Sequence, residues 1–193
     1  MQEPTKAEIA RSYLTDSQAF LIAAQVLERS RNKRTTFAFS PKYYLIRQAI
    51  ELILKSYILV AGGTKKELMH VDVRHNLLRL FNRATELGLV PNDQRIGPLI
   101  QMLGPYHSEY RFRYRKAGFM TVTETRVMCK IAEKLIGQIA PTVNAAMRAH
   151  IAAQRATNRR DVYQSHFRAV SHEINAQNCS PVDPAQIDML FKK

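Results

Sequence analysis

The longest apolar stretch of the chain begins after Ser40-Pro41 and ends at Gly62-Gly63. Apolar residues occupy most faces of a helix drawn over this stretch, which is typical of a helix at the centre of a bundle. Ser followed by Pro marks a helix N-terminus, and glycine marks a C-terminus. The pattern therefore predicts a buried helix from Pro41 to about Ala61.

Periodic apolar positions and capping signals divide the chain on both sides of this helix. Two patterns typical of capping boxes, Thr5-x-x-Glu8 and Thr15-x-x-Gln18, predict a short helix that merges into, or kinks before, a second helix. The second helix is predicted to fade in the polar run of residues 30–34. After a charged loop, Asp72 is predicted to cap a helix that opens on Arg74-His75-Asn76 and stops at Gly88.

Two more helices are predicted in the second half of the chain. One spans Arg95–Leu103 and closes at Gly104-Pro105. The other follows Thr121-x-x-Glu124 and runs to about Arg155, with a kink at Pro141. Residues 106–118 fit either an extended segment or a helical turn. Beyond Arg160 the pattern weakens, with a short helix predicted near residues 187–191.

These elements predict an all-α fold, an up-and-down bundle of about five main helices. The bundle is expected over residues 1–156, and residues 157–193 are expected to form a C-terminal extension with a short helix and loop. The chain has 193 residues, of which 46% are hydrophobic, so it can bury a core.

The charge balance indicates which partners the chain favours. It has 29 Lys and Arg against 16 Asp and Glu, a net charge of +13. Such an excess favours RNA, DNA, nucleotides or an acidic protein, although a protein can also be basic without any such partner.

Cysteine usage and the absence of a long apolar run bear on location. Cys129 and Cys179 form no disulfide framework and no metal-binding spacing, which suits a reducing setting. The N-terminus has no apolar leader, and residues 49–61 are too short to span a bilayer. We therefore expect a cytoplasmic protein with no membrane contact, no metal and no cofactor.

Arg47, Glu51 and Lys55 form an ionic stripe on the central helix, because steps of four place them on one face. One interpretation is a salt-bridge ladder at the bundle surface. The other is the polar floor of a groove, in which Lys55 meets a phosphate or a partner's carboxylate.

Arg74-His75-Asn76 occupies a predicted helix start, where backbone N–H groups and the positive dipole end suit anions. His75 and Asn76 are then recognition groups, or His75 shuttles a proton. Alternatively, His75 caps the turn and contacts the neighbouring helix.

The basic segment Arg111-Phe112-Arg113-Tyr114-Arg115-Lys116 is the strongest binding signal in the chain. Cations can hold phosphates while interleaved rings stack on bases. The segment is equally compatible with an amphipathic element that has solvated arginines and buried rings.

Arg160 and His166 are the candidate catalytic residues. A His can move a proton during RNA cleavage, and an Arg can stabilise the charge on the phosphorane, without a metal. A basic, solvated tail explains the same residues.

Three segments, AIELILKSYILVAGG, RHNLLRLFNRATELG and EYRFRYRKAG, resemble HEPN domains (higher eukaryotes and prokaryotes nucleotide-binding) over roughly residues 15–150. The matching positions are Glu51, Lys55, His75, Leu77 and Arg113-Tyr114. The resemblance implies a compact helical bundle.

The HEPN resemblance implies two uses. Some members are non-catalytic domains that bind nucleotides or associate with nucleotidyltransferases; others are metal-independent endoribonucleases that act as dimers, with Arg-x(4–6)-His at the start of the last core helix. Here that position, Thr121 to Arg126, has no His within reach downstream. The resemblance therefore favours a module that binds nucleotide, RNA or a partner protein. The alternative is a homodimeric ribonuclease using Arg160 and His166.

Overall fold

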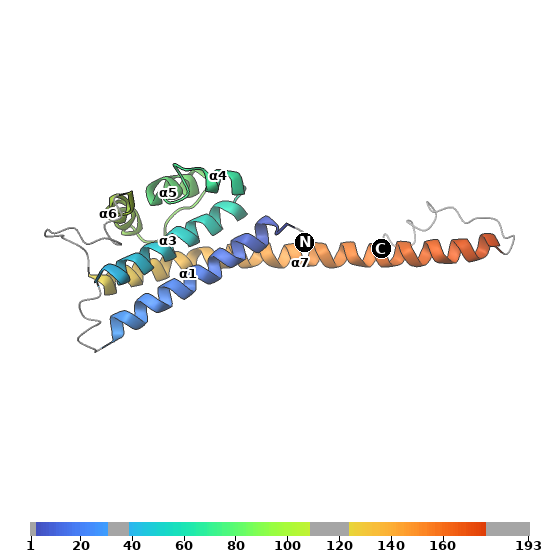
Figure 1. Ribbon diagram of the computed structural model, residues 1–193, viewed down its shortest axis with the longest axis horizontal. Helices are drawn as coiled ribbons and strands as arrows, with labels where there is room; N and C mark the ends of the chain where they lie inside the picture. Colours follow the sequence, from blue (N-terminus) through green and yellow to red (C-terminus); the bar gives the residue numbers. More distant parts are fainter. Residues whose placement is uncertain (1–2, 31–38, 109–123, 177–193) are drawn as a thin grey trace. The chain divides into compact units, whose positions relative to one another are not determined.

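The computed structural model describes the backbone of residues 3–30, 39–108 and 124–176 and the side chains of 3–30, 41–104 and 124–165. Within these ranges all regular structure is helical, as the sequence predicts, with no strand. Figure 1 shows the helices, which are α1 (Lys6–Arg29), α3 (Phe39–Val60), α4 (Lys65–Met69), α5 (Leu77–Glu86), α6 (Ile96–Ser108) and α7 (Thr125–Ala176).

Helices α1 and α3 form an antiparallel pair at the core of the bundle. The Ser17 hydroxyl donates a buried hydrogen bond to the Ala49 carbonyl at 2.8 Å. Nearer the start of α1 and the end of α3, the Ser56 hydroxyl donates to the Ala10 carbonyl at 2.6 Å. The two bonds set the register of the pair.

Small residues allow these two helices to approach closely. The buried face of α1 repeats at alternating steps of four and three residues, which is the spacing of a coiled-coil seam. Every seventh position of that seam is a small residue. Because the distance between two packed helices depends on the size of the side chains at their contact, small residues there allow the helices to lie close together. The seam consists of Ala10, Leu14, Ser17, Leu21 and Ala24.

Helix α5 packs on α3, and α6 packs on α5, so that in Figure 1 α4, α5 and α6 lie on one side of α3 and α1 lies on the other. The loop before α6 is anchored to α7 by Asp93, which accepts hydrogen bonds from Arg95 at 2.7 Å and from Lys134 at 3.0 Å. These bonds, above all those from Arg95, hold the pKa of Asp93 well below its usual range.

Glu28, near the C-terminal end of α1, joins three helices. Its carboxylate accepts hydrogen bonds from Lys42 on α3, at 2.9 Å, and from the Thr125 hydroxyl on α7. Burial alone raises the pKa of Glu28, but the bonds from Thr125 and Lys42 outweigh it, so the pKa is lowered and the carboxylate is ionised.

Two of the three glycine stop signals are confirmed. Gly62 after α3 and Gly88 after α5 have positive φ values of 110° and 96°. In both places the following residue donates back across the helix end, Gly63 to Ile58 at 2.8 Å and Leu89 to Ala84 at 2.9 Å. This is the Schellman arrangement, in which glycine avoids the strain of a left-handed backbone.

The start signals are confirmed only in part. Thr5 and Glu8 form the predicted capping box of α1. The second capping box is wrong, because Thr15 lies inside α1 and its hydroxyl bonds to the Arg11 carbonyl. The N-cap of α5 is Asn76 rather than Asp72.

Three element bounds also differ from the prediction. Helix α3 begins at Phe39, which places Ser40 in the first turn instead of at the cap. The predicted charged loop contains α4, capped by Thr64. Helix α6 continues past Gly104-Pro105 to Ser108.

Helix α7 continues past the predicted end at Arg155 and contains Pro141 in its interior. The chain divides into two compact units, Met1–Arg148 and Ala149–Lys193. The predicted domain boundary at residue 156 lies within α7. Among the described residues, none of the helices has the length and apolar character needed to cross a membrane. The short helix predicted near residues 187–191 lies outside the described residues.

The close approach of α1 and α3 predicts the effect of enlarging a buried small residue. We expect Ala49→Leu to lower the free energy of unfolding by about 1–3 kcal/mol, because the added atoms separate two helices in contact. Ala19→Leu is the matched control, since Ala19 is exposed on α1 and its replacement should change stability by less than about 0.5 kcal/mol. Urea denaturation measures both, and equal losses for the two variants would contradict the packing described.

Candidate functional site

A buried ion cluster lies on the face of α3 that the sequence singles out. Arg47 and Glu51 are fully enclosed, at 0% exposure, and Lys55 is exposed by 8%. The Glu51 carboxylate accepts from Arg47 Nη1 at 3.0 Å and from Lys55 Nζ at 2.7 Å. The predicted salt-bridge ladder therefore exists, but it is buried and does not lie at the bundle surface.

The same cluster holds the turn that precedes α5. Arg47 Nη2 donates to the His75 carbonyl at 2.6 Å. The His75 ring lies with Nδ1 at 3.1 Å from Glu51 Oε1, while half of the side chain is exposed. Two residues of α3 thus hold both the backbone and the ring of His75, and the predicted contact with a neighbouring helix is to Glu51.

The electrostatics keep Glu51 ionised. Burial by itself raises the pKa of this carboxyl group, but the charges of Lys55 and then Arg47, with the Lys55 hydrogen bond, lower it further than burial raises it. The net direction is a lowered pKa. Tyr13 on α1 has a raised pKa, first because it is partly buried and second because the Glu51 charge lies near its hydroxyl.

This arrangement determines what Lys55 can do. Its ammonium group is almost enclosed and bonded to Glu51, so a phosphate would have to compete with a buried carboxylate. The cluster is therefore suited to positioning the His75 turn, and the Lys55 phosphate contact considered from the sequence stays a prediction.

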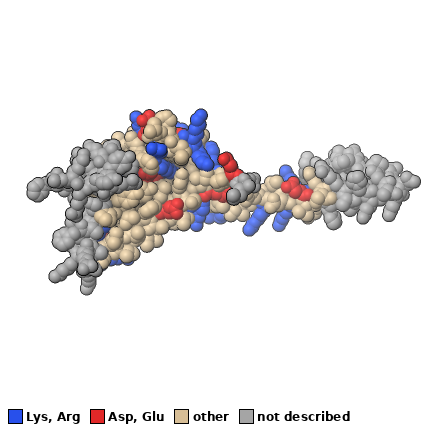
Figure 2. Space-filling view, viewed as in Figure 1, with Lys and Arg blue, Asp and Glu red and all other residues tan. Residues whose placement is uncertain are grey.

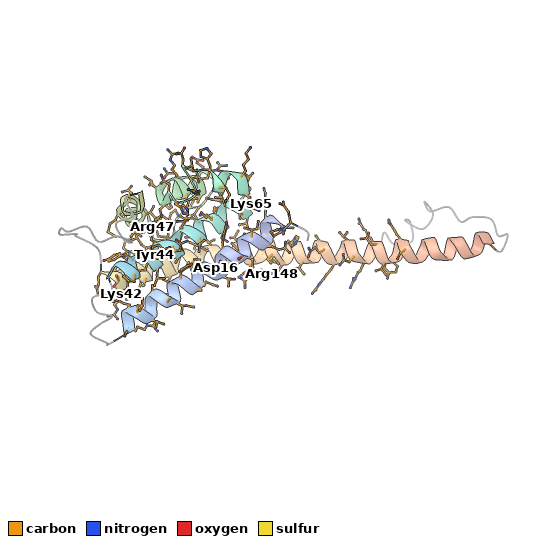
Figure 3. The ribbon with its side chains drawn as sticks, viewed as in Figure 1. Asp16, Lys42, Tyr44, Arg47, Lys65 and Arg148 are labelled. Carbon is orange, nitrogen blue, oxygen red and sulfur yellow. The ribbon has the colours of Figure 1, made fainter. Side chains whose placement is uncertain are left out.

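Exposed cations lie above the cluster on α4, on the following turn and on α5. We define the α4–α5 basic surface as Lys65, Lys66, Arg74, His75 and Arg79, all of them exposed. Figure 2 shows Lys and Arg side chains gathered over these elements. In Figure 3, Lys65 stands on α4, while Arg47 lies between α3 and α5.

Carboxylates on the same elements are engaged in ion pairs of their own. Arg83 is paired with both Glu67 and Glu86. Asp72 lies 3.6 Å from Arg79. Among the residues with described side chains, Lys65, Lys66 and Arg74 have no carboxylate within ion-pair distance. The surface therefore carries uncompensated positive charge.

The start of α5 uses its own cap. The Asn76 side-chain oxygen accepts from the Arg79 backbone N–H at 3.1 Å. One of the amides that could face an anion is thus already bonded. Asn76 has a structural role here, and Arg74 and His75 are the exposed members of the predicted trio.

The remaining predicted residues are not brought to this surface in the described part of the chain. Arg111, Arg113, Tyr114 and Arg115 lie outside the described residues. Arg160 is exposed on α7, and His166 is on the same helix. Six positions along a helix correspond to about 120° around its axis, so these two positions do not share a face.

Sequence reasoning missed the partner of His75 and the cations of α4. The contact between His75 and Glu51 joins residues 24 positions apart, which no local pattern encodes. The cations of α4 were predictable from the sequence. Gly62-Gly63 marks a helix stop and Thr64 is a cap residue, so Lys65 and Lys66, which follow directly, stand at the start of a further helix.

Comparison with protein-family models, with curated proteins and with solved structures found no match to this chain. In the described portion of the chain, no group of three or more His, Cys, Asp and Glu side chains is placed to hold a metal ion. The site must therefore be interpreted from its own geometry.

The buried carboxylate predicts a pH-dependent cost of Glu51→Gln. At pH 7 we expect the variant to lose about 3–5 kcal/mol of unfolding free energy, because Arg47 and Lys55 stay buried without their counter-charge. The pKa of Glu51 is lower in the folded than in the unfolded chain, so its stabilisation is complete above the unfolded value near 4.3 and is lost as pH falls. The difference between wild type and variant should therefore narrow below about pH 5.

Urea titrations at several pH values measure that difference. Glu133→Gln is the control, because Glu133 is exposed on α7 and its replacement should shift stability only slightly at any pH. A difference for Glu51→Gln that stays constant with pH would contradict an ionised Glu51.

Proposed function

We propose that this chain is an HEPN-like helical module that binds RNA through the α4–α5 basic surface without cleaving it. The observation that carries the proposal is the set of exposed cations, Lys65, Lys66 and Arg74, that lack carboxylate partners among the described residues. Phosphate groups are the ligands that such uncompensated charge favours.

The distribution of acidic residues supports this proposal. The carboxylates of Glu51, Glu28 and Asp93 are engaged in internal ion pairs at helix junctions. With a net charge of +13, the surface is left with an excess of cations. A polyanion gains from such a surface by releasing counterions.

The side chains also indicate how RNA would be recognised. Lysine and arginine contact phosphates, and none of the residues of the α4–α5 basic surface other than His75 has a ring that could stack on a base. Binding should therefore depend strongly on salt and weakly on base sequence.

The buried cluster supports the proposal in a second way. Among the residues that carry much of the HEPN resemblance, Glu51 contacts both Lys55 and His75. The cluster holds the backbone of the turn that carries Arg74 and His75, so the exposed cations stand on a fixed segment. A pre-positioned surface loses less conformational entropy on binding.

Neutralising these cations tests the proposal. We expect Lys65→Gln, Lys66→Gln and Arg74→Gln together to weaken binding of a single-stranded RNA. The slope of log K against log salt should become shallower by about 2, because each phosphate contact on a single strand contributes about 0.7. Fluorescence anisotropy with a labelled oligonucleotide, over a salt series, measures both quantities.

The control carries the same change of charge elsewhere on the first unit. Arg29, Arg126 and Lys130 are exposed on α1 and α7, and their replacement by Gln should leave most of the affinity. An unchanged salt slope in the first variant would mean that RNA binds elsewhere on the chain. A third variant that neutralises Arg111, Arg113 and Arg115 then tests whether the basic segment is the binding site. Absence of RNA and nucleotide binding by the wild type would end the proposal, and RNA cleavage in EDTA that is lost with His166→Ala would favour the ribonuclease alternative.

A further inference from the structure

Two exposed apolar side chains lie next to the cations of the α4–α5 basic surface. Met69, the last residue of α4, is exposed by 63%, and Val71, in the turn that follows, is exposed by 71%. We define these two residues as the α4 apolar pair. The core of the bundle takes Leu68 and Val73 from the same stretch of chain and leaves the pair outside. Packing of the bundle therefore does not account for these two side chains.

The α4 apolar pair lies close to the exposed cations. Because Met69 and Val71 are two positions apart in the chain, their Cα atoms are separated by at most about 7 Å. The two lysines of α4 precede Met69 by four and three positions, which are the spacings of neighbouring side chains on a helix. The backbone N–H of Arg74 donates to the His70 carbonyl at 2.9 Å, which closes the turn and keeps Arg74 near Val71. The pair is thus bordered by cations from α4 and from the turn.

The segment that carries the pair is held from both sides. The Thr64 side chain accepts from the Glu67 backbone N–H at 3.1 Å and caps α4, and the Glu67 carboxylate is bonded to Arg83 of α5. Beyond the turn, Arg47 donates to the His75 carbonyl at 2.6 Å. A partner that binds such a segment loses little conformational entropy in ordering it.

The charges around the pair determine which partner is complementary to it. Asp72, which follows Val71, lies 3.6 Å from Arg79, so these two charges compensate each other. Among the residues with described side chains, none places a carboxylate within ion-pair distance of the two lysines of α4 or of Arg74. A complementary partner therefore presents apolar side chains to the pair and carboxylates to the cations around it.

We propose that an acidic amphipathic helix of a partner protein binds the α4–α5 basic surface, with its apolar face on the α4 apolar pair and its carboxylates on Lys65, Lys66 and Arg74. One face of a helix presents side chains about 5–6 Å apart, a spacing compatible with the separation of the pair. The helix binds whether or not RNA does. Because both ligands would use the same cations, the helix also excludes RNA from the surface, and that exclusion rests on the proposed function.

Two other occupants fit the surface less well. Unpaired bases stack on aromatic rings, and neither member of the α4 apolar pair has a ring. Helices that lie on a membrane surface bury several apolar side chains such as Trp, Phe and Leu, whereas Met69 is the one exposed apolar residue of α4. Exposed methionine, by contrast, is common on surfaces that bind amphipathic helices.

A designed peptide tests the inference. The probe is a fluorescein-labelled helix of about four turns with Leu along one face and Glu on both flanks, and the control peptide has Ser in place of every Leu. By fluorescence anisotropy, we expect the wild-type chain to bind the probe about tenfold more tightly than the control peptide, because only the probe buries the apolar pair. Replacing both residues, Met69→Ser with Val71→Ser, should reduce that preference to less than about twofold.

The matched control variant is Val90→Ser. Val90 is exposed by 77% in the loop between α5 and α6, and α6 lies on the far side of α5 from α4 in Figure 1. This variant loses an exposed apolar side chain outside the surface and should keep the full preference for the probe. Circular dichroism checks that every variant keeps its helix content.

A competition experiment separates the inference from the proposed function. The Met69→Ser, Val71→Ser variant keeps all the cations, so its RNA affinity and salt slope should equal those of the wild type. The unlabelled probe should displace labelled RNA from the wild-type chain. Intact preference for the probe in a chain that does not bind RNA would end the proposed function and the competition, and would support the helix site.

Three results would overturn the inference. The first is equal binding of the two peptides, or no binding of either. The second is RNA affinity that falls in the Met69→Ser, Val71→Ser variant, which would assign the α4 apolar pair to unpaired bases. The third is binding to vesicles of phosphatidylcholine and phosphatidylserine that the same variant abolishes, which would assign the pair to a membrane surface.

Discussion

The ionised carboxylate of Glu51 is the interaction on which the arrangement of the first unit depends. It is buried on α3 and accepts from Arg47 and Lys55 of the same helix, with the ring of His75, from the turn before α5, at its edge. A charge so enclosed is tolerated only while its partners stay in place. Any displacement of α5 from α3 would separate His75 from both Glu51 and Arg47, so the interior charge holds the outer helices to the core pair.

The interior and the surface of the first unit divide the charged residues between them. Carboxylates such as Glu28 and Asp93 sit at junctions, where each accepts from groups on two different elements. Lysines and arginines of α4 and α5 remain outside, above the turn that the cluster holds. The turn that carries Arg74 and His75 is thus held by the buried ion pairs of Arg47 and Glu51.

Local signals in the sequence predict the fold well, and the errors arise where contacts between residues far apart in the sequence decide the structure. Gly62 and Gly88 are predictable because a left-handed backbone is a local requirement. Steps of four correctly place Arg47 and Glu51 on one face, but their burial depends on α5, which the spacing cannot encode. Asp72 and Asn76 are both good cap residues, and their local sequence does not distinguish them, whereas in the fold Asn76 caps α5 and the next residue, Leu77, is buried. The capping pattern at Thr15 is overruled by the apolar seam of α1.

The small residues between α1 and α3 have a consequence for how the chain can change in length. Ser17 and Ser56 each donate a hydrogen bond to a carbonyl of the opposite helix. The two bonds are seven residues apart along both helices. To reach another register with small residues at the same contacts, α1 would have to slide along α3 by a whole heptad, about 10.5 Å. Any smaller slide would place leucines where the two backbones are closest. The register is thus determined by the helix faces themselves, and residues can be inserted between α1 and α3 without moving one helix along the other.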